Sequence, residues 1–291
     1  MHSARTITIG NDFTVNRMGF GAMRLCGKHV WGWPDDRENA LRVLRRAVEL
    51  GVNFIDTADA YGPHVNEEQI AAALFPYPAG VAIATKGGST RPAPTEWKRD
   101  GRPEHLIGAC EGSLRRLRLD RIELYQLHAV DPAVPLEEQV GTLRTLRDAG
   151  KIRHIGLSNV NLEQLRHAER IAPIASVQNN YNVGNRESEA VLEHCENGGI
   201  AFIPYFPLDA GDIVALDALE PIAAAHGATI FAVALAWLLR RSPATLPIPG
   251  TSSLEHLAEN VAAARLELTD DEYAALEAAA QPSATDRRAD S

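Results

Sequence analysis

The sequence predicts an α/β fold, a (β/α)8 TIM barrel with an N-terminal β-hairpin that caps the barrel bottom. The first reason is a unit made of a short β-branched run, a polar turn and a helix-period segment, which recurs eight times. The second is length, because eight units within about 250 residues favour a closed barrel over an open doubly wound sheet. The third is glycine just past several helical segments, where a left-handed cap suits it, at Gly51, Gly150, Gly198, Gly199 and Gly227.

The expected strands and helices follow from this alternation. The strands are placed at Met18–Gly21, Asn53–Asp56, Val81–Lys86, Ile122–Leu127, His154–Ser158, Ser176–Asn179, Ala201–Tyr205 and Leu246–Pro249. The helical segments between them include Arg37–Leu50, Pro103–Leu117, Leu136–Ala149, Leu162–Ile171, Glu187–Asn197, Leu216–His226 and Leu254–Ala264. Ahead of the first strand, TITIGNDFTVNR predicts the hairpin, which turns at Gly10, Asn11 and Asp12.

Length and composition indicate one domain that binds a small molecule. With 291 residues, of which 45% are hydrophobic and 23% charged, the chain can bury one large core. We therefore expect a single barrel domain over residues 1–280 and a disordered tail over residues 281–291. The net charge of −9, with acidic and basic residues interspersed, argues against a nucleic-acid partner or an anionic membrane surface.

Cysteine usage and hydropathy favour a cytoplasmic protein that spans no membrane. Cys26, Cys110 and Cys195 are widely separated, which indicates neither a disulfide framework nor a zinc site, so no metal is expected. The N-terminus lacks the apolar region of a signal peptide, and no stretch approaches the roughly 18 apolar residues of a membrane span. No heptad or apolar patch indicates an oligomeric state.

Four ionisable residues lie at or just after the ends of three successive apolar runs. Asp56 ends the run NFID, and Tyr61 follows it across a short polar turn. Lys86 ends VAIATK, and His128 ends RIELYQLH. Because active sites of α/β barrels are built at the carboxyl ends of the strands, these residues are the candidate catalytic group.

The glycine-rich segment GFGAMR does not complete a dinucleotide-binding fingerprint. Gly19 and Gly21 form G-x-G, but Arg24 stands where a third glycine is needed, and the loop-like LCGKHVWGWP follows instead of a helix. The motifs G-x-S-x-G, H-E-x-x-H and G-x-x-x-x-G-K-[ST] are absent from the sequence, which weakens hydrolase and phosphate-loop interpretations.

Seven segments together resemble the aldo-keto reductases. NFIDTADAYG, ATKGG, LYQLH, GKIRHIGLSNV, SVQNNYN, PYFPL and IPGTSSLEHLAENVAAA occur in the order and spacing of that family, from about Asn16 to Leu276. NRMGFGAM, DAYGPHV and IPGTSS resemble a bacterial branch that includes pyridoxal reductases. The resemblance implies an enzyme that reduces an aldehyde or ketone to an alcohol by hydride transfer.

The resemblance also implies a role for each candidate catalytic residue. A reduced carbonyl oxygen needs a proton, and Tyr61 is the implied donor. We expect Lys86 to lower the pKa of Tyr61, Asp56 to orient Lys86, and His128 to donate a hydrogen bond to the substrate oxygen. Taken alone, Asp56 and Lys86 could equally be a structural ion pair.

The implied cofactor is NADPH, with NADH as the alternative. By resemblance, the nicotinamide carboxamide binds Ser158, Asn159 and Gln178, Tyr205 stacks on the ring, and the last barrel helix binds the adenosine phosphate. The full set of expected cofactor contacts is Gly21, Met23, Ser158, Asn159, Gln178, Tyr205, Pro207, Leu208, Gly250, Thr251, Ser252, Ser253, His256, Glu259 and Asn260.

This chain departs from many relatives at the phosphate end of the implied site. Gly250 and His256 stand where those relatives carry basic residues for the 2′-phosphate, and the connector DAGDIVALDALEP is acidic. The hydroxyls of Thr251 to Ser253, together with His256, could still bind a phosphate.

Substrate choice should depend on the barrel loops. Trp31, Trp33 and Trp97 lie in these loops and suggest an aromatic wall for a small-molecule carbonyl such as pyridoxal, although they could equally anchor the loops to the barrel.

Two other functions stay open at this point. One is an NADP(H)-binding regulatory or redox-sensing protein on the same scaffold with slow turnover. The other is a metal-dependent barrel hydrolase, which Lys86 at the centre of the candidate site opposes.

Overall fold

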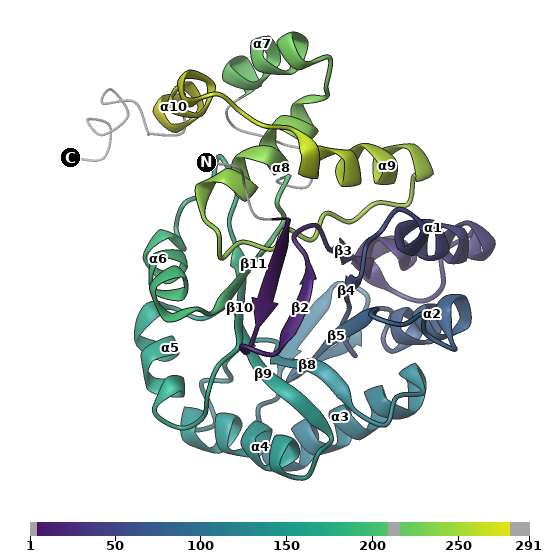
Figure 1. Cartoon of the computed structure of the whole chain (residues 1–291). Helices are drawn as coiled ribbons and strands as arrows, with labels where there is room; N and C mark the ends of the chain where they lie inside the picture. Colours follow the sequence, from purple (N-terminus) through teal and green to yellow (C-terminus); the bar gives the residue numbers. More distant parts are fainter. Residues whose placement is uncertain (1–4, 209–215, 280–291) are drawn as a thin grey trace.

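Seven parallel strands form the wall of a barrel that is surrounded by helices (Figure 1). The computed structural model describes residues 5–208 and 216–279. The strand order is β11-β10-β9-β8-β5-β4-β3, and every neighbouring pair is parallel. These strands are β3 (Phe20–Gly21), β4 (Phe54–Asp56), β5 (Ala82–Gly87), β8 (Ile122–Leu127), β9 (Ile152–Ser158), β10 (Ser176–Asn180) and β11 (Ala201–Tyr205). The predicted barrel is therefore confirmed.

The eighth predicted strand, Leu246–Pro249, closes the barrel without forming a regular ladder. Leu246 N donates to Phe202 O at 2.8 Å on one side, and Gly19 N donates to Pro247 O at 2.9 Å on the other. Because Pro247 and Pro249 have no N–H, the segment accepts hydrogen bonds from β3 but cannot return them. The prediction of a regular strand here was wrong for this reason.

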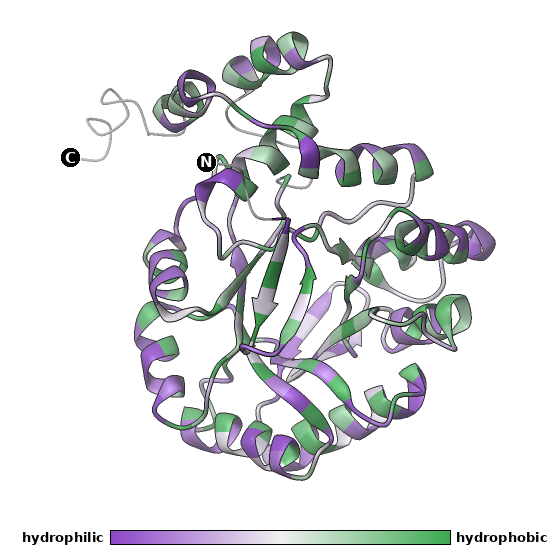
Figure 2. Cartoon of the chain, in the orientation of Figure 1, coloured by the Kyte–Doolittle hydropathy of each residue, from purple (hydrophilic) through white to green (hydrophobic). Residues whose placement is uncertain are grey.

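The helices lie outside the strands and mostly match the predicted ranges. They are α1 (Arg37–Glu49), α2 (Val65–Leu74), α3 (Pro103–Leu117), α4 (Leu136–Asp148), α5 (Leu162–Glu169), α6 (Glu189–Gly198), α7 (Leu216–His226), α8 (Ile230–Arg241), α9 (Leu254–Ala262) and α10 (Asp270–Ala279). Local signals explain several of their ends: Asn161 and Gln164 form a capping box at α5, and Pro103 opens α3. In Figure 2 the outer helices carry both hydrophilic and hydrophobic residues along their length, as amphipathic helices do.

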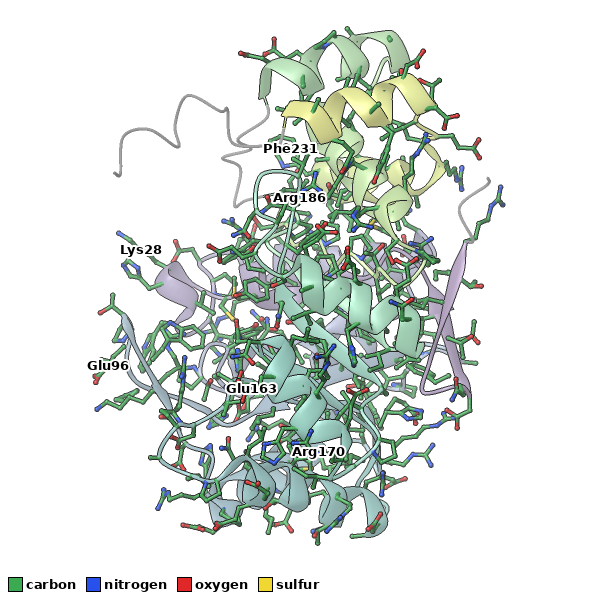
Figure 3. The ribbon with its side chains drawn as sticks, turned by 90° about the vertical axis from the view of Figure 1, so that its left-hand side faces the viewer. Lys28, Glu96, Glu163, Arg170, Arg186 and Phe231 are labelled. Carbon is green, nitrogen blue, oxygen red and sulfur yellow. The ribbon has the colours of Figure 1, made fainter. Side chains whose placement is uncertain are left out.

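The N-terminal hairpin closes the lower end of the barrel, as predicted. Its strands are β1 (Thr6–Ile9) and β2 (Phe13–Asn16), paired antiparallel around the expected turn. Ile9 and Val15 are buried in one cluster with Phe54, Leu124 and other residues inside the barrel. In Figure 3 this hairpin lies at the edge opposite to Lys28 and Glu96, which project from the other end.

Alternation along the strands divides the barrel interior into an apolar layer and a polar layer. Phe54, Ala84, Leu124 and Ile203 belong to the interior cluster. Since side chains alternate between the two faces of a strand, the residue two positions later points the same way, which brings Asp56, Lys86, Gln126 and Tyr205 to the carboxyl end. The packed lower layer thus supports a polar site above it.

A second hairpin lies beside this polar end, in a segment predicted from the sequence to be a barrel loop. Its strands are β6 (Ser89–Ala93) and β7 (Glu96–Arg99), and they pair antiparallel with an irregularity between Thr90 and Ala93. The hairpin carries Trp97, whose side chain is 45% exposed and therefore available for contact.

No single helix among residues 5–208 and 216–279 has the length and apolar character to cross a membrane. The helix pair Asp217–His226 and Ile230–Arg241 meets both criteria only when taken together, and it is bent by 96°. The predicted tail at residues 281–291 and most of the acidic connector lie outside the described residues.

Candidate active site

A cavity of about 490 Å³ lies at the carboxyl ends of the strands, a size typical of small-molecule sites. Its lining residues are Gly21, Met23, Arg24, Asp56, Tyr61, Trp97, His128, Ser158, Asn159, Gln178, Tyr205, Phe206, Pro207, Leu208, Phe231, Ile248, Pro249, Gly250, Thr251, Ser252, His256, Glu259 and Asn260. Of the residues predicted from sequence, only Lys86, Ser253, Trp31 and Trp33 do not line it.

A buried ion pair lies beneath the cavity. Lys86 Nζ donates to Asp56 Oδ1 at 2.6 Å and to Thr57 O at 2.8 Å, and both Lys86 and Asp56 are almost fully buried. Burial lowers the pKa of Lys86, but Asp56 and then Tyr61 raise it more, so the net pKa lies above its ordinary value. The ammonium therefore stays charged at neutral pH.

Two glutamines complete the surroundings of the Asp56 carboxylate. Gln126 Nε2 donates to Asp56 Oδ2 at 3.1 Å, and Gln178 Nε2 donates to the same oxygen at 2.8 Å. Gly156 makes room for this arrangement, since a Cβ there would lie 2.7 Å from Gln126 Cγ. The carboxylate thus accepts three hydrogen bonds, which offset the cost of burying its charge.

Tyr61 connects the ion pair to the cavity. Lys86 Nζ lies 3.5 Å from the Tyr61 hydroxyl, and the Tyr61 side chain lines the cavity while only 8% exposed. Burial raises the pKa of Tyr61 above its ordinary value of 10, and Lys86 only partly offsets this rise. The expectation that Lys86 produces a net lowering was wrong, because desolvation of the phenolate outweighs the attraction of one ammonium.

His128 is held neutral beside Tyr61. The two rings meet edge to face, with centroids 5.8 Å apart. Burial, with a smaller contribution from Lys86, lowers the pKa of His128 to about 3. Its Nδ1 is buried without a hydrogen-bond partner, so the single proton of the neutral ring is better placed on Nε2.

Trp97 forms an aromatic wall next to these two residues. Its ring centroid lies 6.4 Å from that of Tyr61 and 5.9 Å from that of His128. The Arg91 guanidinium stacks 3.9 Å from the Trp97 ring centroid and donates to the backbone oxygens of His29, Val30 and Pro94. Arg91 therefore fixes the hairpin, and with it Trp97, against the loop after β3.

The other two predicted substrate residues lie away from the cavity. The Trp33 ring is covered by the Arg37 guanidinium, 4.7 Å from its centroid, and the Trp31 ring faces Arg91 at 5.7 Å. Trp31 also forms a parallel bridge with Gly62. These contacts favour the alternative interpretation, in which Trp31 and Trp33 anchor their loops to the barrel.

The polar residues after β9 and β10 are already linked to their neighbours. Asn159, at a positive φ of 56°, donates through Nδ2 to His128 O at 3.0 Å and accepts from the Tyr205 hydroxyl at 2.7 Å. Because Gln178 donates its amide N–H to Asp56, its carbonyl oxygen is the group left for a ligand.

The loop before α9 is ordered by its own hydroxyls. Thr251 Oγ1 accepts from Ser253 N at 3.0 Å, and Ser253 Oγ caps the helix by accepting from His256 N at 3.3 Å. Ser253 therefore acts as the N-cap in this structure and does not line the cavity.

Five lining residues were not predicted from the sequence: Arg24, Phe206, Phe231, Ile248 and Pro249. Arg24 lies in the short 3-10 helix after β3, at the end of the glycine-rich segment GFGAMR. Phe231 projects from the start of α8, a helix with no clear polar face, and it is labelled in Figure 3.

Within residues 5–208 and 216–279, no group of three or more His, Cys, Asp or Glu side chains could hold a metal ion. The fold and the site define a (β/α)8 barrel whose polar residues gather at the carboxyl ends of the strands, where enzymes of this fold carry their active sites.

Comparison with known proteins identifies the family. The Aldo/keto reductase family matches residues 17–281. An uncharacterized oxidoreductase of Schizosaccharomyces pombe is 46% identical over 275 residues, which cover 94% of this chain and 89% of the relative. Pyridoxine 4-dehydrogenase of Escherichia coli is 42% identical over 281 residues, which cover 94% and 98%.

A solved structure agrees with this assignment. An aldo-keto reductase from Klebsiella pneumoniae in complex with NADPH has a TM-score of 0.81 at 28% identity, and the match covers 96% of each chain. The present chain belongs to the Aldo/keto reductase family, and it is an NAD(P)H-dependent oxidoreductase.

Proposed function

We propose that this protein is an NADPH-dependent reductase of aldehydes or ketones in which Tyr61 donates the proton to the carbonyl oxygen. The observation that carries the proposal is the position of the Tyr61 hydroxyl, 3.5 Å from the buried Lys86 ammonium and on the wall of the cavity. A tyrosine held in this way can give up a proton without releasing it to bulk water.

The cavity suits a nicotinamide dinucleotide. The amides of Asn159 and Gln178 can hold a carboxamide, the Tyr205 ring can stack on the nicotinamide, and the loop from Gly250 to Ser252 can accommodate a phosphate. Backbone packs closely at this place, since a Cβ on Gly250 would lie 2.5 Å from Gly21 O. When bound, the reduced nicotinamide supplies the hydride that reduces the carbonyl carbon.

The protonation states of Tyr61 and Lys86 allow a proton to pass from Tyr61 to the substrate. Tyr61 is a neutral phenol at neutral pH because burial raises its pKa, so it is present in the form that an acid requires. As the alkoxide develops, the proton moves from the Tyr61 oxygen to the substrate oxygen. The nearby Lys86 ammonium stabilises the resulting phenolate.

His128 and Asp56 support this transfer in different ways. The neutral imidazole of His128, with its proton on Nε2, can donate a hydrogen bond to the carbonyl oxygen and orient it towards Tyr61. Asp56 keeps Lys86 charged and fixes its direction through the 2.6 Å contact. Asp56 is thus a positioning residue, and Tyr61 and His128 are the groups that touch the substrate.

An aromatic carbonyl is the favoured substrate class. The rings of Trp97, Tyr61 and His128 lie beside one another, with centroids 5.8 to 6.4 Å apart. Such a group of aromatic side chains suits a substrate with a flat ring. Pyridoxal is a suitable candidate, in keeping with the name of the Escherichia coli relative.

The direct test measures NADPH and NADH oxidation by the purified protein with pyridoxal and 4-nitrobenzaldehyde, with each carbonyl omitted as the control. We expect carbonyl-dependent oxidation of NADPH that exceeds that of NADH. The reverse assay, pyridoxine with NADP⁺, should reduce the dinucleotide. Absence of carbonyl-dependent oxidation with either dinucleotide, in a protein that still binds NADPH, would support the regulatory alternative instead.

A further inference from the structure

We propose that Arg24 binds the 2′-phosphate of NADP(H) and sets the preference of this enzyme for NADPH over NADH. The inference rests on the proposed function, since it assigns one phosphate of that cofactor to one side chain. No residue of the loop before α9, where the sequence predicts phosphate ligands, carries a permanent positive charge.

Arg24 lies where the first strand meets the last loop of the barrel. It belongs to the 3-10 helix η1 (Ala22–Leu25), which follows β3 without a break. Gly21 N donates to Pro249 O at 3.4 Å, so η1 starts beside the segment that leads into Gly250 and Thr251. Arg24 is exposed and lines the same cavity as Thr251, Ser252 and His256.

The charges around the cavity single out this arginine. Among the described residues that line it, Arg24 is the only lysine or arginine. Glu259 lines the cavity as well, and a carboxylate by itself favours a ribose hydroxyl and repels a phosphate. A dianionic 2′-phosphate near Glu259 and His256 therefore needs a compensating cation, and Arg24 can supply it.

Packing at Gly250 explains why the cation comes from position 24. A Cβ on Gly250 would lie 2.5 Å from Gly21 O, so no side chain fits there unless the backbone shifts. The same Cβ would lie 3.5 Å from Arg24 Cγ, which shows that the stem of Arg24 passes over this glycine. The arginine thus occupies the space beside the loop that a side chain on residue 250 would otherwise take.

Both sides of this site are held in place. Asn66 Nδ2 donates to Ala22 O at 2.9 Å, and Gln69 Nε2 donates to Leu25 O at 2.9 Å, which ties both ends of η1 to α2. In the neighbouring loop before α9, Asn39 Nδ2 donates to Ser252 O at 2.7 Å. Binding therefore requires little backbone ordering, and a guanidinium, with five N–H groups in one plane, matches the oxygens of a phosphate.

The experiment measures the dissociation constants of NADP⁺ and NAD⁺ by calorimetry for the wild type, Arg24→Leu and Arg24→Lys. We expect Arg24→Leu to weaken NADP⁺ binding by about 10- to 100-fold, the range for a charged hydrogen bond, and to change NAD⁺ binding by less than about 3-fold. Arg24→Lys should recover part of the loss because it keeps the charge without the planar fork. Arg121→Leu is the matched control, since Arg121 precedes β8 at the opposite end of the barrel and does not line the cavity.

A second measurement isolates the phosphate. In the wild type, 2′,5′-ADP should bind more tightly than 5′-ADP, and Arg24→Leu should remove this advantage. Equal weakening of NADP⁺ and NAD⁺ would overturn the proposal by placing Arg24 at the diphosphate, and unchanged NADP⁺ binding would overturn it as well. A wild type that binds neither dinucleotide would refute the proposed function itself, which distinguishes the two failures.

Discussion

Lys86 donates to Asp56 across 2.6 Å in a region where neither side chain is more than 3% exposed, and the same ammonium faces the Tyr61 hydroxyl. The pair is almost closed to solvent, and it meets the cavity through Asp56 and Tyr61, which both line it. The buried ammonium therefore acts on the Tyr61 hydroxyl at the cavity wall, and in this way the buried ion pair influences the chemistry of the site.

The first prediction concerns the stability of this buried pair. Asp56→Asn leaves the Lys86 ammonium without its counter-ion, and we expect a loss of about 3–5 kcal/mol in the free energy of unfolding, measured by urea denaturation. The double variant Asp56→Asn with Lys86→Met should recover part of the loss, because it removes the uncompensated charge. Arg46→Met breaks the exposed pair with Glu49, at 3.1 Å, and should cost less than about 1 kcal/mol. Equal losses of unfolding free energy in Asp56→Asn and Arg46→Met would show that burial does not strengthen the Asp56 pair.

The second prediction concerns the charge of His128. Its pKa in the folded protein, about 3, lies below its ordinary value of 6.5. The unfolded chain therefore binds more protons between these values, so the stability that the neutral ring contributes is complete above about pH 6.5 and is lost as the pH falls towards 3. His128→Gln should show a shallower loss of stability than the wild type across this interval. In nitrogen-15 spectra, the ring should retain the Nε2–H neutral tautomer at pH 5, and an imidazolium pattern at that pH would contradict the assignment.

The third prediction concerns the ionisation of Tyr61. Because burial raises its pKa, the ultraviolet difference between the wild type and Tyr61→Phe should contain no phenolate signal below about pH 10. Lys86→Met should move the signal to still higher pH, since it removes the charge that partly offsets burial. A phenolate signal from Tyr61 at neutral pH would show that Lys86 outweighs burial.

The fourth prediction concerns the aromatic wall. Trp97→Ala should raise KM for an aromatic aldehyde about 2- to 13-fold, the equivalent of one aromatic contact, and should change KM for a small aliphatic aldehyde less. Arg91→Met should have an intermediate effect, because it frees the hairpin without removing the ring. Trp33→Ala is the control, because Trp33 contacts Arg37 away from the cavity. This variant should leave the KM values for both aldehydes unchanged.

The fold was predictable wherever local pattern and packing agree. Short apolar runs such as Ile122–Leu127 are buried on both faces, as strands of a parallel barrel are. Helices with caps or an opening proline, such as Pro103–Leu117, begin and end at the predicted residues. The helix α8 was not predicted because its first turns are apolar on every side, so the sequence shows no 3.6-residue period. The closing segment was misjudged because its prolines accept hydrogen bonds but cannot donate them.

The positions of the site residues at the strand ends were predictable from the sequence, whereas the net pKa values of these residues were not. Motif order placed Asp56, Tyr61, Lys86 and His128 together, but the net pKa of Tyr61 depends on how deeply the ring is buried, which sequence does not record. Arg24 could not be assigned because its meeting with Gly250 joins segments more than 200 residues apart. The single-domain boundary at residue 280 stays a prediction.

Proton donation by Tyr61 is tested by comparing the wild type and Tyr61→Phe in NADPH oxidation with an aromatic aldehyde, alongside calorimetric NADP⁺ binding. The variant should lose about 10²- to 10⁴-fold in kcat, the usual contribution of a general acid, with NADP⁺ affinity within about 2-fold of the wild type. A variant that binds NADP⁺ normally and still reduces the aldehyde at the wild-type rate would show that Tyr61 is not the proton donor.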